Sequence, residues 1–94
     1  MTKAAQLKLV KNIAGSLAPY GVTVNNVAPG AIATPRNSAI TEDPALRAAV
    51  EAKIPAGRFG TPEDISPTVL LLCSDAGAYI TGSDIVIDGG MSLR

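Results

Sequence analysis

Two short stretches of this sequence carry groups that could take part in chemistry. Lys3 stands in the first turn of a predicted helix, where a lysine taken alone is a solvated surface residue. The run Pro29-Gly30-Ala31-Ile32-Ala33-Thr34 follows a predicted strand, at the sheet edge where open α/β folds bind ligands. Gly30 lets the backbone approach the ring of a ligand closely, and Pro29 fixes the direction in which the chain leaves the strand. The alternative is an ordinary strand-ending turn before an irregular loop.

The hydrophobic pattern predicts the elements that must position these residues. Apolar residues recur at helical spacing over residues 2–18, and Pro19-Tyr20-Gly21 ends that helix. Strands are predicted at 22–28, where β-branched residues gather, and at 85–87. The polar stretch up to residue 43 is predicted to be a loop, followed by a lid-like helix at 44–52. Another helix is predicted at 62–74, with Thr61 as its cap.

This order of elements predicts an α/β fold. A strand, a helical crossover and a second strand of this length imply a parallel pair with a right-handed connection. Two parallel strands form a poor sheet alone, because such strands normally need further neighbours and cover on both faces. We therefore expect residues 1–94 to form a single partial domain, with two parallel strands and three or four helices.

The composition limits the partners and the compartment. Eight basic and eight acidic residues cancel, so no net field favours nucleic acid or an anionic membrane. The longest apolar run, Val69 to Cys73, is too short to span a bilayer, and no secretory signal is visible. The single Cys73 excludes an internal disulfide and is expected to be a packing residue. A cytoplasmic location is the default expectation, and we assign no metal-binding residue.

Four motifs resemble, in their order, those of the short-chain dehydrogenase/reductase family. They are Thr2-Lys3-Ala4-Ala5, Pro29-Gly30-Ala31-Ile32-Ala33-Thr34, Arg58-Phe59-Gly60-Thr61-Pro62-Glu63-Asp64 and Asp88-Gly89-Gly90. Together they span essentially all 94 residues without a large insertion. The resemblance implies the C-terminal part of such a protein, starting just after the active-site tyrosine. The fold it implies is the C-terminal portion of a Rossmann-like, doubly wound parallel sheet.

The resemblance also implies roles for individual residues. Lys3 would be the catalytic lysine of the family, whose ammonium lowers the pKa of a tyrosine four residues earlier. That tyrosine would fall two positions before Met1. Pro29, Gly30, Ile32 and Thr34 would bind the cofactor, with backbone groups of Ile32 at the nicotinamide carboxamide and the Thr34 hydroxyl nearby. The cofactor of the full-length family is NAD or NADP.

The function that the resemblance implies is part of an NAD(P)-dependent oxidoreductase. Such an enzyme would transfer hydride between nicotinamide and an alcohol or carbonyl substrate of the sugar, polyol or 3-oxoacyl type, and would form a homo-oligomer. The glycine-rich turn for the pyrophosphate and the catalytic serine and tyrosine are not in this sequence, so we expect the isolated chain to be inactive and not to bind the cofactor. Two alternatives remain, a non-catalytic interaction or oligomerisation module and one half of a split enzyme.

Overall fold

The computed structural model describes residues 1–93, which form four α-helices, four short 3₁₀ turns and one pair of strands. The chain divides into two compact units. The first unit comprises residues 1–28 and 67–85. The second comprises residues 29–66 and the chain from residue 86 on. The predicted α/β class is confirmed, and each unit is described by itself below.

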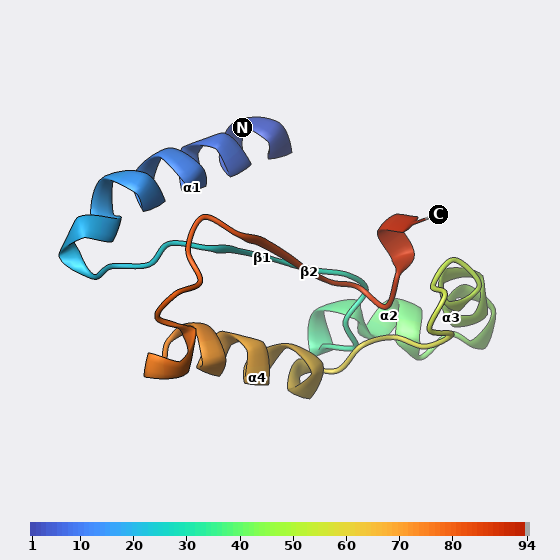
Figure 1. Ribbon diagram of the computed structural model, residues 1–94. Coiled ribbons are helices and arrows are strands. Elements are labelled where there is room, and N and C mark those ends of the chain that lie inside the picture. The colour runs from blue at the N-terminus through green and yellow to red at the C-terminus, as the bar shows by residue number, and fades with distance from the viewer. Residues whose placement is uncertain (94) are drawn as a thin grey trace. The chain divides into compact units, whose positions relative to one another are not determined.

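The two strands, β1 (Asn26–Pro29) and β2 (Asp84–Ile87), form a two-stranded sheet. The Asn26 N–H donates to the carbonyl of Ser83 at 2.8 Å, and the Gly30 N–H donates to that of Ile87 at 3.0 Å. Donor and acceptor both advance by four residues in the same direction, which is the register of a parallel pair. The predicted parallel pairing is confirmed (Figure 1).

The first strand is shorter than the predicted 22–28. Val24 donates its N–H to the hydroxyl of Thr81 at 3.1 Å, and the Asn25 side chain donates to the carbonyl of Ile80 at 3.0 Å. The facing chain turns at Gly82, whose φ of 70° a β-branched residue could not adopt without strain. The regular ladder therefore begins only at Asn26, although β-branched residues extend further back.

Helix α1 (Lys3–Leu17) confirms the first predicted helix and lies in the first unit. The Thr2 hydroxyl caps it by accepting from the Ala5 N–H at 3.1 Å. Gln6 donates its side-chain amide to Asn26 at 2.9 Å, which joins α1 to β1. Within this unit, α1 lies on one side of the strands and the end of α4 on the other (Figure 1).

Helix α4 (Pro62–Leu72) begins where the sequence predicts and ends two residues early. Its first turn is closed by Asp64, whose carboxylate accepts from the Thr61 N–H at 2.8 Å. The Thr61 hydroxyl donates to the same carboxylate at 3.2 Å, so it does not act as the predicted acceptor cap. Pro67 stays inside the helix, and the Ser66 hydroxyl donates to the Pro62 carbonyl at 2.8 Å.

The second unit contains short helices where the sequence predicts a loop. A 3₁₀ turn (Pro35–Asn37) runs into the one-turn helix α2 (Ser38–Thr41). The loop prediction was wrong because Pro35 starts a turn and the Thr41 hydroxyl donates back to the Asn37 carbonyl at 3.3 Å. Helix α3 (Pro44–Glu51) is as predicted, and the carboxylate of its cap residue Asp43 accepts from two backbone N–H groups.

Few apolar side chains are buried within residues 1–93. They are Ala14 in the first unit, and Ile54 and Phe59 in the second. Large apolar side chains remain exposed on α1 and α4, among them Leu9, Ile13 and Leu70. None of the helices in the described part of the chain is both long and apolar enough to cross a membrane.

Candidate functional site

Gly30 lies where β1 ends, next to the end of β2. A Cβ atom on Gly30 would lie 2.6 Å from Cβ and 2.7 Å from Cα of Asp88, closer than carbon atoms can approach. The hydrogen bond from Gly30 to Ile87 holds the two segments at this separation. A glycine is therefore needed at position 30, because any side chain there would collide with Asp88 beside the end of β1.

The segment after Gly30 makes a second parallel contact, between Ile32 and Gly60. The Gly60 N–H donates to the Ala31 carbonyl at 2.9 Å, and the Ala33 N–H donates to the Gly60 carbonyl at 2.8 Å. In this pattern the N–H and carbonyl of Ile32 point away from Gly60. A Cβ on Gly60 would lie 2.7 Å from Ile32 Cδ1, so the glycine also gives this side chain room. Ile32 therefore presents a backbone donor and acceptor on the open edge.

Asn37 closes the loop that follows Ile32. Its side-chain amide donates to the Ile32 carbonyl at 2.6 Å, and its backbone N–H donates to the Thr34 carbonyl at 2.9 Å. Thr34 is half-buried, and its hydroxyl has no hydrogen-bond partner among residues 1–93. The Ile32 N–H is equally without a partner in that part of the chain. Two free polar groups thus remain on a loop whose shape is held by Asn37.

A cleft of about 190 Å³ lies beside this segment in the second unit. Its apolar wall includes Ala31, Ile32 and Ile87, and its charged wall consists of Arg58, Asp64 and Asp88. Arg58 Nη1 and Asp64 Oδ2 are 2.9 Å apart, and Nη2 donates to Oδ1 at 3.3 Å. In this bidentate pair the two opposite charges compensate each other.

Hydrogen bonds lower the pKa of both carboxylates of the cleft, Asp64 and Asp88. The hydrogen bond from Arg58, assisted by the Thr61 N–H, holds the pKa of Asp64 well below its usual range. Hydrogen bonds from Ser92, and then from Gly90, lower the pKa of Asp88. Lowered pKa values suit structural acceptors and not a general acid near neutral pH. Arg58 and Asp64 thus stabilise the turn that leads into α4.

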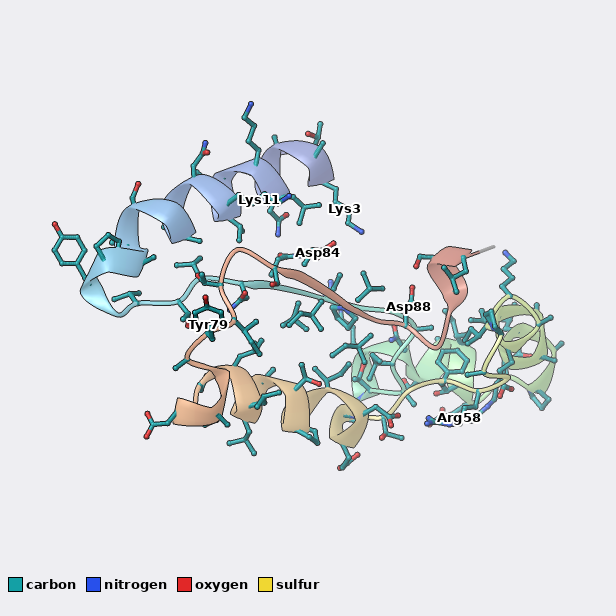
Figure 2. All side chains as sticks on the ribbon, viewed as in Figure 1. Lys3, Lys11, Arg58, Tyr79, Asp84 and Asp88 are labelled. Carbon is teal, nitrogen blue, oxygen red and sulfur yellow. The ribbon has the colours of Figure 1, made fainter. Side chains whose placement is uncertain are left out.

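Lys3 occupies the first turn of α1, where Figure 2 labels it. It falls on the helix face that carries Leu7, Val10 and Ala14 toward the strands, because these positions follow at helical spacing. Its side chain is exposed and has no hydrogen-bond or ion-pair partner among residues 1–93. Lys3 belongs to the first unit.

The other four predicted site residues belong to the second unit, on one continuous segment. Pro29 ends β1 and is exposed, Gly30 touches Asp88, and Ile32 and Thr34 carry the free backbone and hydroxyl groups. Sequence reasoning missed Asn37. An asparagine five residues beyond Ile32, in a polar stretch with no periodicity, gives no signal that its amide returns to that carbonyl.

Comparison with known proteins places the chain in a family. Residues 1–92 match the family model described as enoyl-(acyl carrier protein) reductase. Over 92 residues the chain is 44% identical to 3beta-hydroxysteroid dehydrogenase 1 of Eggerthella lenta, covering 98% of this chain and 35% of that protein. Over 90 residues it is 43% identical to the 3-oxoacyl-[acyl-carrier-protein] reductase FabG of Aquifex aeolicus, covering 96% and 36%.

A solved structure agrees with these relatives. The solved structure described as 4-hydroxyisoleucine dehydrogenase complexed with NADH matches with a TM-score of 0.89 and 32% identity, over 98% of this chain and 38% of that one. The chain therefore belongs to the short-chain dehydrogenase/reductase family, and its fold is part of the Rossmann-like sheet of that family. It spans roughly a third of the length of the relatives it matches, 35% and 36% for the two above.

Proposed function

We propose that this chain forms the nicotinamide end of the active site in an NAD(P)-dependent oxidoreductase. The enzyme transfers hydride between the nicotinamide and an alcohol or carbonyl substrate. The observation that carries the proposal is the edge of Ile32, whose N–H and carbonyl point away from Gly60 at the carboxyl end of β1. Open α/β sheets bind their ligands at this end of the strands.

The residues of this segment fit one end of a dinucleotide. A primary carboxamide has one acceptor and two donor hydrogens, which complement the free N–H and the carbonyl of Ile32. The unpartnered Thr34 hydroxyl can donate or accept beside them. When bound, the nicotinamide supplies or accepts the hydride. The chain's own residues hold its carboxamide edge and fix which face the substrate meets.

Lys3 has a separate task in the proposal. A lysine ammonium close to a phenol stabilises the phenolate and so lowers the pKa of the phenol. The family resemblance gives Lys3 this relation to a tyrosine supplied by the rest of the enzyme. The lowered pKa lets that phenol exchange a proton with the substrate oxygen near neutral pH. We assign Lys3 as catalytic and Pro29, Gly30, Ile32 and Thr34 as cofactor-binding residues.

The partners and compartment follow from the same proposal. We propose a small alcohol or carbonyl substrate of the sugar, polyol or 3-oxoacyl type, as the resemblance implies; the names of the two relatives above refer to a steroid and to a 3-oxoacyl substrate. We propose a cytoplasmic homo-oligomer, in which the exposed apolar faces of α1 and α4 are covered by other protein. The isolated chain would contact only one end of the cofactor, so we propose that alone it neither binds NAD(P) tightly nor catalyses.

A second candidate function is a non-catalytic interaction module. Its support is the extent of the exposed apolar surface, with Leu70 on α4 70% exposed and Leu9 on α1 44% exposed. Soluble monomers rarely leave such side chains uncovered in groups. A half of a split enzyme would show the same surface, and adding its complementary half would cover that surface and restore hydride transfer.

A hybrid enzyme tests the proposal. This chain replaces the matching C-terminal third of the Aquifex aeolicus reductase, and oxidation of NADPH or NADH is followed by absorbance with the reductase's own 3-oxoacyl substrate. We expect cofactor oxidation that depends on the substrate. A folded hybrid that binds the cofactor no better than the isolated chain would contradict the proposal and favour the interaction module.

A further inference from the structure

The side chain of Asn37 makes a hydrogen bond that neither the family motifs nor the helix pattern requires. Its amide nitrogen lies 2.6 Å from the Ile32 carbonyl oxygen, and the bond is partly buried. The backbone N–H of the same residue donates to the Thr34 carbonyl at 2.9 Å. A single residue thus fastens two carbonyls of the segment that carries the free N–H of Ile32 and the free hydroxyl of Thr34.

The contact with Asn37 indicates which kind of group fits the edge of Ile32. The edge of Ile32 that faces away from Gly60 carries one N–H and one carbonyl. The group that already occupies part of this edge, the Asn37 side chain, is a primary carboxamide. A carbonyl oxygen has two lone pairs, so one remains available beside the one that Asn37 uses. The edge is therefore suited to a second carboxamide, held by the Ile32 N–H and the remaining lone pair.

Asn37 also connects this edge to the helices that follow. The Thr41 hydroxyl donates to the Asn37 carbonyl at 3.3 Å, and an Arg47 guanidinium nitrogen donates to the Thr41 carbonyl at 3.3 Å. A line of hydrogen bonds runs from Ile32 through Asn37 to α2 and α3, all within the second unit. The position of Asn37, and with it the hydrogen bond to the Ile32 carbonyl, is thus tied to α2.

We propose that Asn37 is a positioning residue for the carboxamide of the nicotinamide cofactor. It touches no reacting atom. Its amide fixes the Ile32 carbonyl and the loop to Thr34 before the cofactor arrives, so that less order has to be imposed on binding. The inference rests on the proposed function, and it adds a residue that links the cofactor edge to α2.

The change Asn37→Asp isolates the role of the amide donor. An aspartate has nearly the same size but, when ionised, is an acceptor only, so its carboxylate would face the Ile32 carbonyl without a hydrogen to share. Asn12→Asp is the matched control. Asn12 is exposed on α1, and its side chain has no hydrogen-bond partner among residues 1–93.

The first measurement needs no activity. NMR of the 94-residue chain labelled with nitrogen-15 compares the side-chain amide protons of Asn37 and Asn12. We expect the Asn37 protons to exchange with solvent at least tenfold more slowly. Equal exchange for the two asparagines would overturn the proposal, because the positioning bond would then not persist in solution.

The second measurement uses the hybrid enzyme. We expect Asn37→Asp to raise the KM for NAD(P)H about tenfold or more, with a smaller change in kcat, and Asn12→Asp to change neither. A fall in kcat with an unchanged KM would overturn the positioning role, because it indicates less folded enzyme or a defect in chemistry. A wild-type hybrid without activity would count against the proposed function, while the NMR comparison would still decide whether Asn37 holds the loop.

Discussion

At the residue scale, Gly30 and Gly15 differ in whether the structure leaves room for a side chain. A methyl group on Gly30 would collide with the backbone and Cβ of Asp88, whereas nothing lies within 4 Å of the Cβ position of Gly15, in the last turn of α1. We expect Gly30→Ala to lower the free energy of unfolding by about 1–3 kcal/mol, as overpacking does. Gly15→Ala should raise it by about 0.4–1 kcal/mol. Urea unfolding followed by circular dichroism measures both, and equal effects would contradict the account of Gly30.

The lowered pKa of Asp64 predicts how its contribution to stability depends on pH. Arg58, the largest cause, and then the Thr61 N–H lower the pKa of Asp64 from its ordinary 3.8. Because the pKa is lower in the folded state, the stabilising contribution is complete above pH 3.8 and is lost as the pH falls toward the lowered pKa. We expect Arg58→Gln to raise the pKa of Asp64, yet leave it below 3.8 because the Thr61 N–H still donates.

Carbon-13 NMR of the carboxyl group, titrated with acid, measures this shift. Arg36→Gln is the control, since Arg36 is exposed and makes no ion pair with the described residues. An unchanged Asp64 pKa in Arg58→Gln would show that the bidentate pair does not form in solution.

Part of the candidate site could be predicted from residue types and part could not. Pro29 and Gly30 marked the exit of a strand, and the motif around Ile32 and Thr34 indicated a ligand edge. The close contact of Gly30 with Asp88 could not be predicted, because it depends on which strands are neighbours, and the approach of a ring to Gly30 stays a prediction. Asn37 was beyond sequence reasoning, since its bond depends on the path of a loop that has no periodic pattern.

At the element scale, Arg47 fastens α3 to the turn at Phe59. Its guanidinium carbon lies 5.6 Å from the ring centroid of Phe59, and its Nε is 3.3 Å from Glu51 Oε1. Such exposed contacts contribute about 0.5–1 kcal/mol each at most. We expect Arg47→Ala to leave the chain folded, and to speed amide hydrogen exchange in α3 several-fold. Lys53→Ala, which changes an exposed lysine after the same helix, should not.

Equal exchange in the two variants would show that Arg47 does not hold α3 in place. The lid-like character expected for this helix stays a prediction until that exchange is measured.

The helices and strands whose ends are set by local residue types could be predicted from the sequence. Proline at the first helical position and an acidic residue beside it located α3 and α4 correctly. The strand at 22–28 was predicted too long, because β propensity continues through Val22 and Val24 while the facing chain turns at Gly82. Helix α2 was missed, because one turn is too short to show a helical period.

At the scale of the whole molecule, the chain buries few apolar side chains and leaves many large ones exposed. Among residues 1–93 three apolar side chains are buried, whereas the consecutive residues Val69, Leu70 and Leu71 of α4 are exposed. We expect the isolated chain to self-associate in gel filtration and to bind the dye ANS. Leu70→Lys should reduce both, and Ala48→Lys, which adds the same charge to an exposed position of α3, should not. A monomeric wild-type chain without dye binding would contradict this.

That residues 1–94 form a single partial domain stays a prediction. The chain divides into two compact units, and the boundaries between their residue ranges fall within β1, α4 and β2. The family is established by the match over residues 1–92, and the activity of the whole enzyme is proposed.

The most direct test of the central claim compares two lysines of α1 in the hybrid enzyme. Lys3→Met removes the proposed catalytic ammonium, and Lys11→Met removes an exposed lysine two turns further along. We expect Lys3→Met to lower kcat by about 10²-fold or more, as the loss of general acid–base catalysis does, and Lys11→Met to change kcat less than about twofold. Equal kcat values in the two variants would contradict the claim that this chain carries the catalytic lysine.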